Sequence, residues 1–279
     1  MRLLMLLIIS IVVFCHIPSA LVHASTQMDK EYSKVIKHFL PKDAELLKPH
    51  SHTQTQPVQA YDFDQDGQKE LIVPFKQPGD PVKIKVMILK KERHNWKKIW
   101  ERAGEGFDIE LSTLLDITGD GVKEYVVGWM VGASAGNKLE IFQWQSPSFK
   151  EIYDHFYHKM DILTKDHHIY LAIWDRFCCD AYIVDVIGWN GKMLTNNAKV
   201  YTEYYPKVDE FYKKKIEKMD AWFYWYALAD AQIKANLLNE ARTSIQKGLS
   251  FNLENKMFVD LQKELDKKEE QKVRKSSEN

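Results

Sequence analysis

A nine-residue acidic segment occurs twice in this sequence, and each copy leads directly into a run of strand-forming residues. The first copy, Asp62–Glu70, continues into Leu71–Phe75, and the second copy, Asp116–Glu124, continues into Tyr125–Val131. The two copies begin 116 − 62 = 54 residues apart. A repeat at a fixed spacing indicates similar units packed side by side, because one such unit cannot bury its apolar face alone. The repeat therefore restricts the chain to folds that place like β units next to each other.

Further strands are expected where Val, Ile, Tyr and Trp recur between turns rich in Asp, Gly and Pro. The clearest predicted strands are Leu71–Phe75, Val82–Lys90, Trp96–Glu101, Tyr125–Val131, Leu139–Trp144, Ile169–Trp174 and Tyr182–Trp189. Within them, Lys85–Ile88 of the first unit aligns with Glu140–Gln143 of the second. The last two strands belong to a third, weaker unit, whose loop at residues 164–168 lacks the acidic pattern.

A spacing of 54 residues accommodates four strands per unit, as in a blade of a β-propeller. Two to three units are fewer than the roughly four to eight blades of known propellers. We therefore expect a mainly β domain with added α-helices, which is propeller-like but incomplete or open. A small sandwich is the alternative.

Helical patterns flank the β domain on both sides. Apolar residues recur at helical spacing from Met28 to Leu40, and Pro41 ends that pattern. The spacing becomes helical again from Lys213 onward. The predicted organisation is a leading helix within residues 25–48, a β repeat domain at residues 49–206, and a C-terminal helical hairpin with a charged tail at residues 207–279.

Residues 221–251 resemble a single tetratricopeptide repeat. The residues at the characteristic positions of that family are Trp225, Leu228, Ala229, Leu238, Ala241, Ile245 and Gly248. The pattern departs from the family at Gln232 and Asn236. The resemblance implies a helical hairpin, which a final helix from Asn255 to about Lys268 would cap. One repeat does not make a peptide-binding groove, because such repeats normally stack in threes or more.

The two acidic loops offer oxygen ligands in an alternating pattern that suits a divalent cation. The first loop contains Asp62, Asp64, Asp66 and Glu70 at positions 1, 3, 5 and 9, with the carbonyl of Gln68 as a further ligand. The second loop contains Asp116, Thr118, Asp120 and Glu124, with the carbonyl of Val122. Calcium fits better than magnesium, because it accepts six to eight oxygen ligands in flexible geometry. We expect weaker binding in the second loop, where a hydroxyl replaces one carboxylate.

An EF-hand is excluded for the first loop. That motif requires Glu at position 12 and helices on both sides, whereas position 12 is Val73 within a predicted strand. The alternative to a metal site is that Asp66-Gly67 and Asp120-Gly121 form only hairpin turns. Under that alternative the other acids of the first loop would repel one another without compensation.

The loops instead resemble the nine-residue calcium loops of FG-GAP and VCBS repeats, which build the blades of integrin α-chain propellers and occur in many secreted bacterial proteins. The resemblance covers residues 55–145 well and residues 160–200 poorly, and the Phe-Gly and Gly-Ala-Pro signatures are absent. It implies structural calcium bound at roughly 0.1 to 1 mM. It also implies a protein or a cell-wall polymer as the ligand.

The N-terminus has the three parts of a secretory signal peptide. Arg2 precedes the apolar run Leu3–Phe14, and Val22-His23-Ala24 forms a small-residue cleavage site. The run is shorter than the roughly 20 apolar residues of a membrane span. We expect cleavage after Ala24, a secreted or extracytoplasmic location in the cell envelope, and no stable membrane span. Retention of the segment as an anchor and lipid attachment at Cys15 are the alternatives.

Cleavage would leave Cys178 and Cys179 as the only cysteines. Neighbouring cysteines in an oxidising compartment can close a vicinal disulfide, or they can simply pack on opposite faces of a strand. The 39 basic and 39 acidic residues give no net charge. That balance argues against a nucleic-acid partner or an anionic lipid surface, because both favour a surplus of Lys and Arg.

One enzyme motif occurs, because residues 132–136 match G-x-S-x-G around Ser134. A nucleophile elbow needs a helix after the serine, but Leu139–Trp144 alternates like a strand, so we expect a hairpin loop. Helical spacing would place His155 and His158 on one face, and each is expected to be a surface or interface histidine rather than a ligand. The aromatic residues Tyr201, Tyr204, Tyr205 and 222–226 are expected to fill a seam between sheet and helices, with stacking on sugars as the alternative.

The function expected from the sequence is a non-enzymatic, extracytoplasmic binding or scaffold module with structural calcium. One alternative is a secreted hydrolase that uses Ser134 or a metal at the acidic loops. The other is a subunit of an envelope assembly held through the helical hairpin.

Overall fold

The computed structural model describes residues 32–51, 55–79, 81–251 and 256–277, and its contacts divide the chain into the units Met1–Pro41 and Lys42–Asn279. The predicted signal peptide at residues 1–24, with Cys15, lies outside the described residues. In the first unit residues 32–39 are helical, which confirms a helix within the predicted leading segment. Over the described part of the chain, no helix is both long enough and apolar enough to cross a bilayer.

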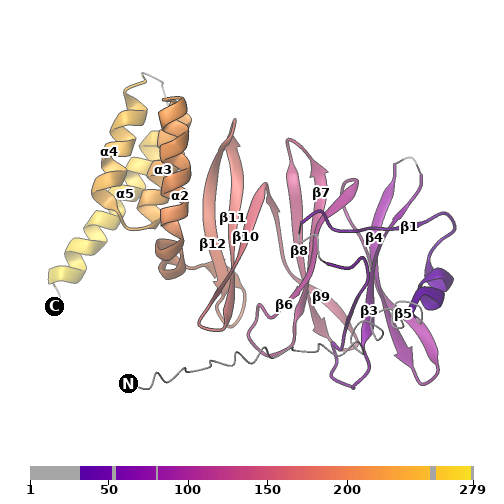
Figure 1. Cartoon of the computed structure of the whole chain (residues 1–279). Helices are drawn as coiled ribbons and strands as arrows, with labels where there is room; N and C mark the ends of the chain where they lie inside the picture. Colours follow the sequence, from indigo (N-terminus) through magenta and orange to yellow (C-terminus); the bar gives the residue numbers. More distant parts are fainter. Residues whose placement is uncertain (1–31, 52–54, 80, 252–255, 278–279) are drawn as a thin grey trace, which may run out of the picture. The chain divides into compact units, whose positions relative to one another are not determined.

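Three antiparallel sheets follow one another in the second unit (Figure 1). The first sheet contains β1 (Glu45–Leu46), β2 (Gln59–Tyr61), β3 (Glu70–Gln77), β4 (Lys83–Glu92) and β5 (Asn95–Ala103). The second contains β6 (Asp108–Leu115), β7 (Glu124–Gly132), β8 (Gly136–Gln145) and β9 (Ser148–Tyr157). The third contains β10 (Lys159–Lys165), β11 (His168–Cys178), β12 (Ala181–Trp189) and β13 (Leu194–Asn196).

Each sheet is a meander of four sequential strands, with β1 added beside β3 in the first sheet. This confirms the expectation of four-stranded units, and the segment with the weaker pattern proves to be a complete third sheet. The seven predicted strands all lie in strands of the structure, although β4 begins at Lys83 rather than at Val82. The strands β6, β9 and β10 and the short strands β1, β2 and β13 were not predicted. The reason is clearest in β9, whose ten residues include only two buried ones and so show little apolar alternation.

The middle sheet is covered on both faces. In β7 the side chains of Tyr125, Val127 and Trp129 belong to the core shared with the first sheet, and Val126 belongs to the core shared with the third. Alternate residues of a strand face opposite sides of a sheet, so a strand covered on both faces must be apolar throughout. The unbroken apolar run of β7 follows from this position.

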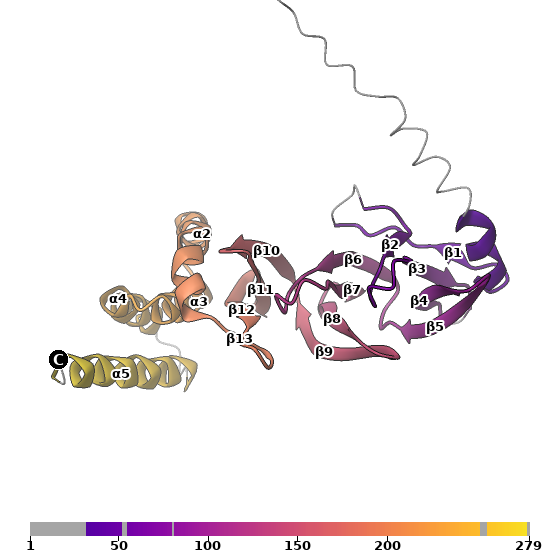
Figure 2. The same cartoon turned by 90° about the horizontal axis from the view of Figure 1, so that it is seen from below.

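The stack of sheets is open. The second view shows the three sheets in succession, with the helices following the third one (Figure 2). The described strands therefore do not close into a propeller ring, in agreement with the expectation of an open arrangement.

Four helices occupy the described C-terminal part: α2 (Ala198–Lys218), α3 (Trp222–Lys234), α4 (Leu238–Leu249) and α5 (Lys256–Ser277). The predicted boundary at residue 207 was wrong, because α2 already begins at Ala198 and continues through Pro206. Its start is fixed by Asn197, whose side-chain oxygen accepts a hydrogen bond of 3.0 Å from the Val200 N–H. The predicted hairpin over residues 221–251 is confirmed as α3 and α4, with α5 packed against both.

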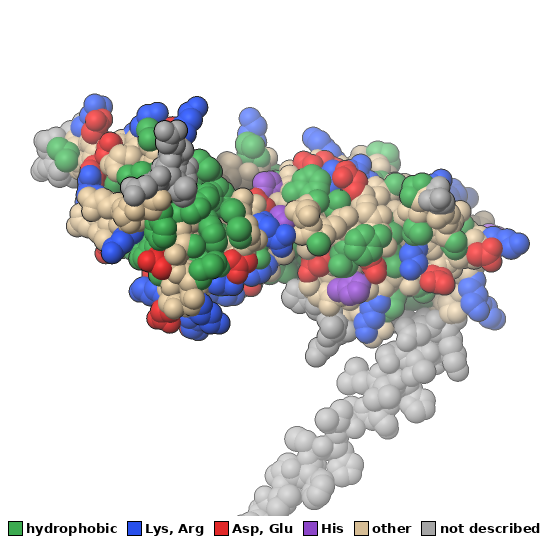
Figure 3. Space-filling model, turned by 90° about the horizontal axis from the view of Figure 1, so that it is seen from above, with side chains coloured by type: hydrophobic (Ala, Val, Ile, Leu, Met, Phe, Trp, Pro, Cys, Tyr) green, Lys and Arg blue, Asp and Glu red, His purple; other side chains and the backbone are tan. Residues whose placement is uncertain are grey.

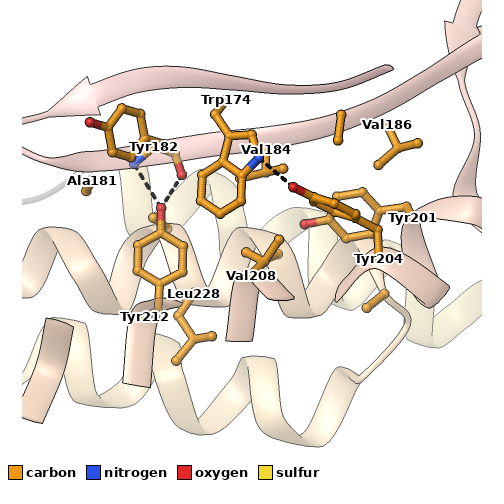
Figure 4. Packing of buried hydrophobic residues seen from close by; sticks show 14 of the residues in the cluster. Trp174, Ala181, Tyr182, Val184, Val186, Tyr201, Tyr204, Val208, Tyr212 and Leu228 are labelled. Atoms are coloured by element: carbon orange, nitrogen blue, oxygen red, sulfur yellow. Dashed lines mark hydrogen bonds between the residues drawn. The ribbon is translucent and has the colours of Figure 1, made fainter. Parts of the chain in front are cut away.

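Aromatic side chains fill the seam between the third sheet and the helices (Figure 4). The indole N–H of Trp174 donates to the hydroxyl of Tyr204 at 2.9 Å. The hydroxyl of Tyr212 accepts from the backbone N–H of Tyr182 at 2.8 Å and donates to the carbonyl of the same residue. The seam role predicted for the tyrosines of α2 is thus confirmed, and these bonds fix α2 against β11 and β12.

Candidate functional site

The two acidic loops occupy the same place in neighbouring sheets. The first loop connects β2 to β3, and the second connects β6 to β7. Each ends on a glutamate that opens the inner strand, Glu70 in β3 and Glu124 in β7, and both glutamates are buried. The sequence repeat is therefore a repeat in three dimensions.

In both loops the aspartate at position 1 accepts two backbone hydrogen bonds, one of them from the glycine at position 6. The carboxylate of Asp62 accepts from the backbone N–H groups of Asp66 and Gly67 at 3.1 and 2.9 Å. The carboxylate of Asp116 accepts from those of Gly119 and Gly121 at 2.8 and 3.1 Å. The aspartate at position 1 thus holds the turn closed in both copies.

Positions 5 and 9 repeat in the same way. Asp66 accepts from the N–H of Gln68, and Asp120 accepts from the N–H of Val122, both at 2.8 Å. These N–H groups of Gln68 and Val122 cap the loop, and the metal-ligand role expected for the carbonyl groups of the same two residues stays a prediction. The glutamate at position 9 accepts at 2.8 Å from the N–H of position 2, which is Phe63 in the first loop and Ile117 in the second.

A lysine from the neighbouring strand enters the first loop. Lys90 of β4 lies across from Glu70, one residue beyond the cross-strand pair of Leu71 and Leu89. Its ammonium nitrogen is 2.5 Å from Asp64, 2.8 Å from Asp66 and 3.1 Å from Glu70. Burial opposes the charge, but the hydrogen bonds to the three carboxylates outweigh it and raise the pKa of Lys90.

The same contacts alter the acids. The hydrogen bond from Lys90 lowers the pKa of Asp66. Burial raises the pKa of Glu70, although hydrogen bonds from Phe63 and Lys90 partly offset it. Lys90 therefore offsets the repulsion among the carboxylates of this loop, for which the sequence alone indicated no positive partner.

The first loop fits a divalent cation in one respect and not in another. Oxygens of Asp62, Asp64 and Glu70 lie within 4.8 Å of one another, and one buried oxygen of Asp64 has no hydrogen-bond partner. However, the ammonium of Lys90 already contacts three of the four carboxylates. A metal ion in this loop would have to displace it.

The second loop has no such lysine. Across from Glu124, one residue beyond the pair of Tyr125 and Phe142, lies Gln143. The carboxylate of Glu124 accepts from the hydroxyl of Thr118 at 2.9 Å and from the amide of Gln143 at 3.4 Å. Burial raises the pKa of Glu124. Among the ion pairs of the described residues, none involves Asp116, Asp120 or Glu124.

The other predicted site residues lie elsewhere. Ser134 is in the hairpin between β7 and β8, so a strand and not a helix follows it, and the nucleophile elbow is not formed. His158 lies 3.1 Å from the main-chain oxygen of Ser134, not from its hydroxyl. Of the two alternatives for Cys178 and Cys179, the structure has free thiols, with their sulfur atoms 3.1 Å apart.

The histidines expected on a helix lie on a strand and next to it. His155 belongs to the edge strand β9, and His158 follows that strand directly. His155 pairs at 2.7 Å with Asp175 of β11 and so connects the second and third sheets. The helix prediction was wrong because β9 has few buried residues and gives no strong period of two.

Comparison with known proteins adds no family. No protein-family model matches this chain, and no curated protein matches it. The resemblance to calcium-loop repeats therefore remains a hypothesis that depends on the loop residues themselves.

Proposed function

We propose that this chain is a non-enzymatic, extracytoplasmic binding or scaffold module, built from three stacked blade-like sheets whose acidic loops are held by cations. The observation that carries the proposal is the repetition of one loop between the first two strands of two adjacent sheets, with shared hydrogen bonds from the N–H of position 6 to the aspartate of position 1 and from the N–H of position 2 to the glutamate of position 9. The ligand implied by the resemblance is a protein or a cell-wall polymer.

Calcium is the cation proposed for the second loop. Asp116, Asp120, Glu124 and the hydroxyl of Thr118 supply hard oxygen donors, and the ion would neutralise charge beside the buried Glu124. In the free protein that carboxylate has only neutral hydrogen-bond donors. A group that is buried and ionised without a cation costs free energy, which calcium binding would recover.

A role as a subunit of an envelope assembly is the second candidate, and one observation favours it. Apolar side chains cover a broad area over the helical part in the space-filling view (Figure 3). The exposed large apolar residues of the helices and their connections include Met219, Leu249, Met257, Val259 and Val273. A contiguous apolar area like the one in this view is typical of an interaction surface. Deletion of residues 221–279 should then abolish a complex that the whole protein forms.

Thermal melts in calcium and in chelator test the main proposal. Calcium should raise the melting temperature of the wild type, because a ligand that binds only the folded state stabilises it. The double substitution Asp116→Asn with Asp120→Asn should remove that increase. Asp154→Asn, a change of an exposed aspartate on β9, is the matched control and should preserve it. An unchanged melting temperature in the wild type would contradict the calcium part of the proposal.

A further inference from the structure

One difference between the loops, at position 3, occurs together with a difference at the cross-strand position of the neighbouring strand. Position 3 is Asp64 in the first loop and Thr118 in the second, and the cross-strand position is Lys90 in the first and Gln143 in the second. Asp64 contacts Lys90 at 2.5 Å, whereas Thr118 and Gln143 both donate to Glu124. The extra carboxylate and the extra ammonium therefore occur together.

The charge balance is the same in both loops. The first has four carboxylates together with Lys69 and Lys90, which gives −4 + 2 = −2, and the second has three carboxylates together with Lys123 and the neutral Gln143, which gives −3 + 1 = −2. An additional acid without Lys90 would raise the repulsion in a turn that also contains the buried Glu70. The pairing explains why four acids can share the first loop without a metal ion.

The geometry of the lysine matches the role of a bound cation. Its side chain is only 13% exposed, and an ammonium group has three N–H donors for the three carboxylates it contacts. The carboxylates of positions 3, 5 and 9 converge on it, while that of position 1 closes the turn through backbone N–H groups. In a calcium loop the same three side chains would face the ion.

We propose that the ammonium of Lys90 is the resident cation of the first loop and takes the place of a calcium ion there. The first sheet then folds without metal, and calcium binding is confined to the second loop. The inference rests on the proposed function only in treating both loops as cation sites, because the contacts of Lys90 stand by themselves.

Calorimetric calcium titrations and thermal melts of the full chain test this assignment. Lys90→Gln copies the residue of the second loop and removes the ammonium. Without calcium the variant should melt roughly 5 to 10 °C below the wild type, because a partly buried charge network has lost its cation. With calcium it should recover most of that loss and bind one more ion than the wild type does.

Lys91→Gln is the matched control, because the next residue on β4 points to the opposite face of the sheet. It should change neither the stoichiometry nor the melting temperature by more than about 2 °C. Lys90→Met also removes the charge but keeps the apolar part of the side chain, so its melting temperature without calcium is a second measure of the same loss.

Two results would overturn the assignment. One is a Lys90→Gln variant that gains no calcium site. The other is a wild type whose calcium binding is lost on Asp64→Asn, because calcium would then enter the first loop in spite of Lys90. If the second loop does not bind calcium, the wild type will bind no calcium at all. The number of calcium ions gained by Lys90→Gln relative to wild type would still decide the role of Lys90.

Discussion

Glu140 of β8 is the buried charge that connects the first two sheets, and its substitution should show how strongly they are coupled. Its carboxylate is 2% exposed and accepts from two nitrogens of Arg102 on β5, at 3.1 and 2.5 Å. It also accepts from the indole N–H of the fully buried Trp129 at 2.8 Å. The hydrogen bond to Glu140 is the main reason why the pKa of Arg102 is raised.

The size of the effect follows from these contacts. A hydrogen bond to a charged group contributes about 1.5 to 3 kcal/mol. Arg102 is 38% exposed and also contacts Glu151, so solvent and the second partner recover part of what Glu140→Gln removes. We therefore expect a loss of about 2 to 3 kcal/mol in the free energy of unfolding for Glu140→Gln. Glu140→Leu should cost about 3 to 5 kcal/mol, because it also leaves the N–H of Trp129 buried without an acceptor.

Urea denaturation followed by tryptophan fluorescence measures these losses. Glu151→Gln is the matched control, because it removes the other carboxylate partner of Arg102 but is itself 36% exposed. An exposed pair of this kind contributes about 0 to 1 kcal/mol. A loss for Glu140→Gln as small as that for Glu151→Gln would refute the role of Glu140 as a buried connection between the sheets.

Two further predictions concern the other joints of the molecule. Tyr212→Phe should lower the free energy of unfolding by about 2 to 4 kcal/mol, because it leaves the buried N–H and C=O of Tyr182 without their side-chain partner. Urea denaturation measures this loss. An unchanged midpoint would show that Tyr212 does not fix α2 to β12. The hydrogen bond to Asp175 raises the pKa of His155, although burial opposes it. A raised pKa in the folded state stabilises the protein below the unfolded value of about 6.5, and this stability is lost as the pH rises through the folded value. Between about pH 6 and pH 8, wild type and the exposed control His94→Gln should therefore lose more stability than His155→Gln does. Identical pH profiles for all three proteins would contradict a stabilising role of the pair between His155 and Asp175.

The inner strands could be predicted from the sequence, because a strand that is buried on one or both faces of its sheet has a clear apolar pattern. The runs Leu71–Phe75 and Tyr125–Val131 proved to lie in β3 and β7, which are buried for most of their length. The edge strand β9 is largely exposed, so its residues are free to be polar and its period is hidden. The start of α2 was missed for a different reason. Pro206 was taken as the end of the β region, although it lies inside the helix.

The two loops were also found from the sequence, because positions 1, 5, 6, 8 and 9 of a nine-residue segment are identical in both copies. Lys90 was not, because its role depends on strand register. The sequence comparison aligned Lys85–Ile88 with Glu140–Gln143, whereas the cross-strand pairs align Lys90 with Gln143. An alignment shifted by two residues keeps every side chain on the correct face of the strand, since the period is two, and so gave no sign of the error.

The most direct test of the two cation sites is a crystal structure of the wild-type protein soaked in calcium, with the anomalous signal used to locate the ion. We expect one calcium ion in the second loop, bound by Asp116, Asp120 and Glu124, and the ammonium of Lys90 still among the carboxylates of the first loop. An ion in the first loop with Lys90 displaced, or no ion in either loop, would contradict this expectation.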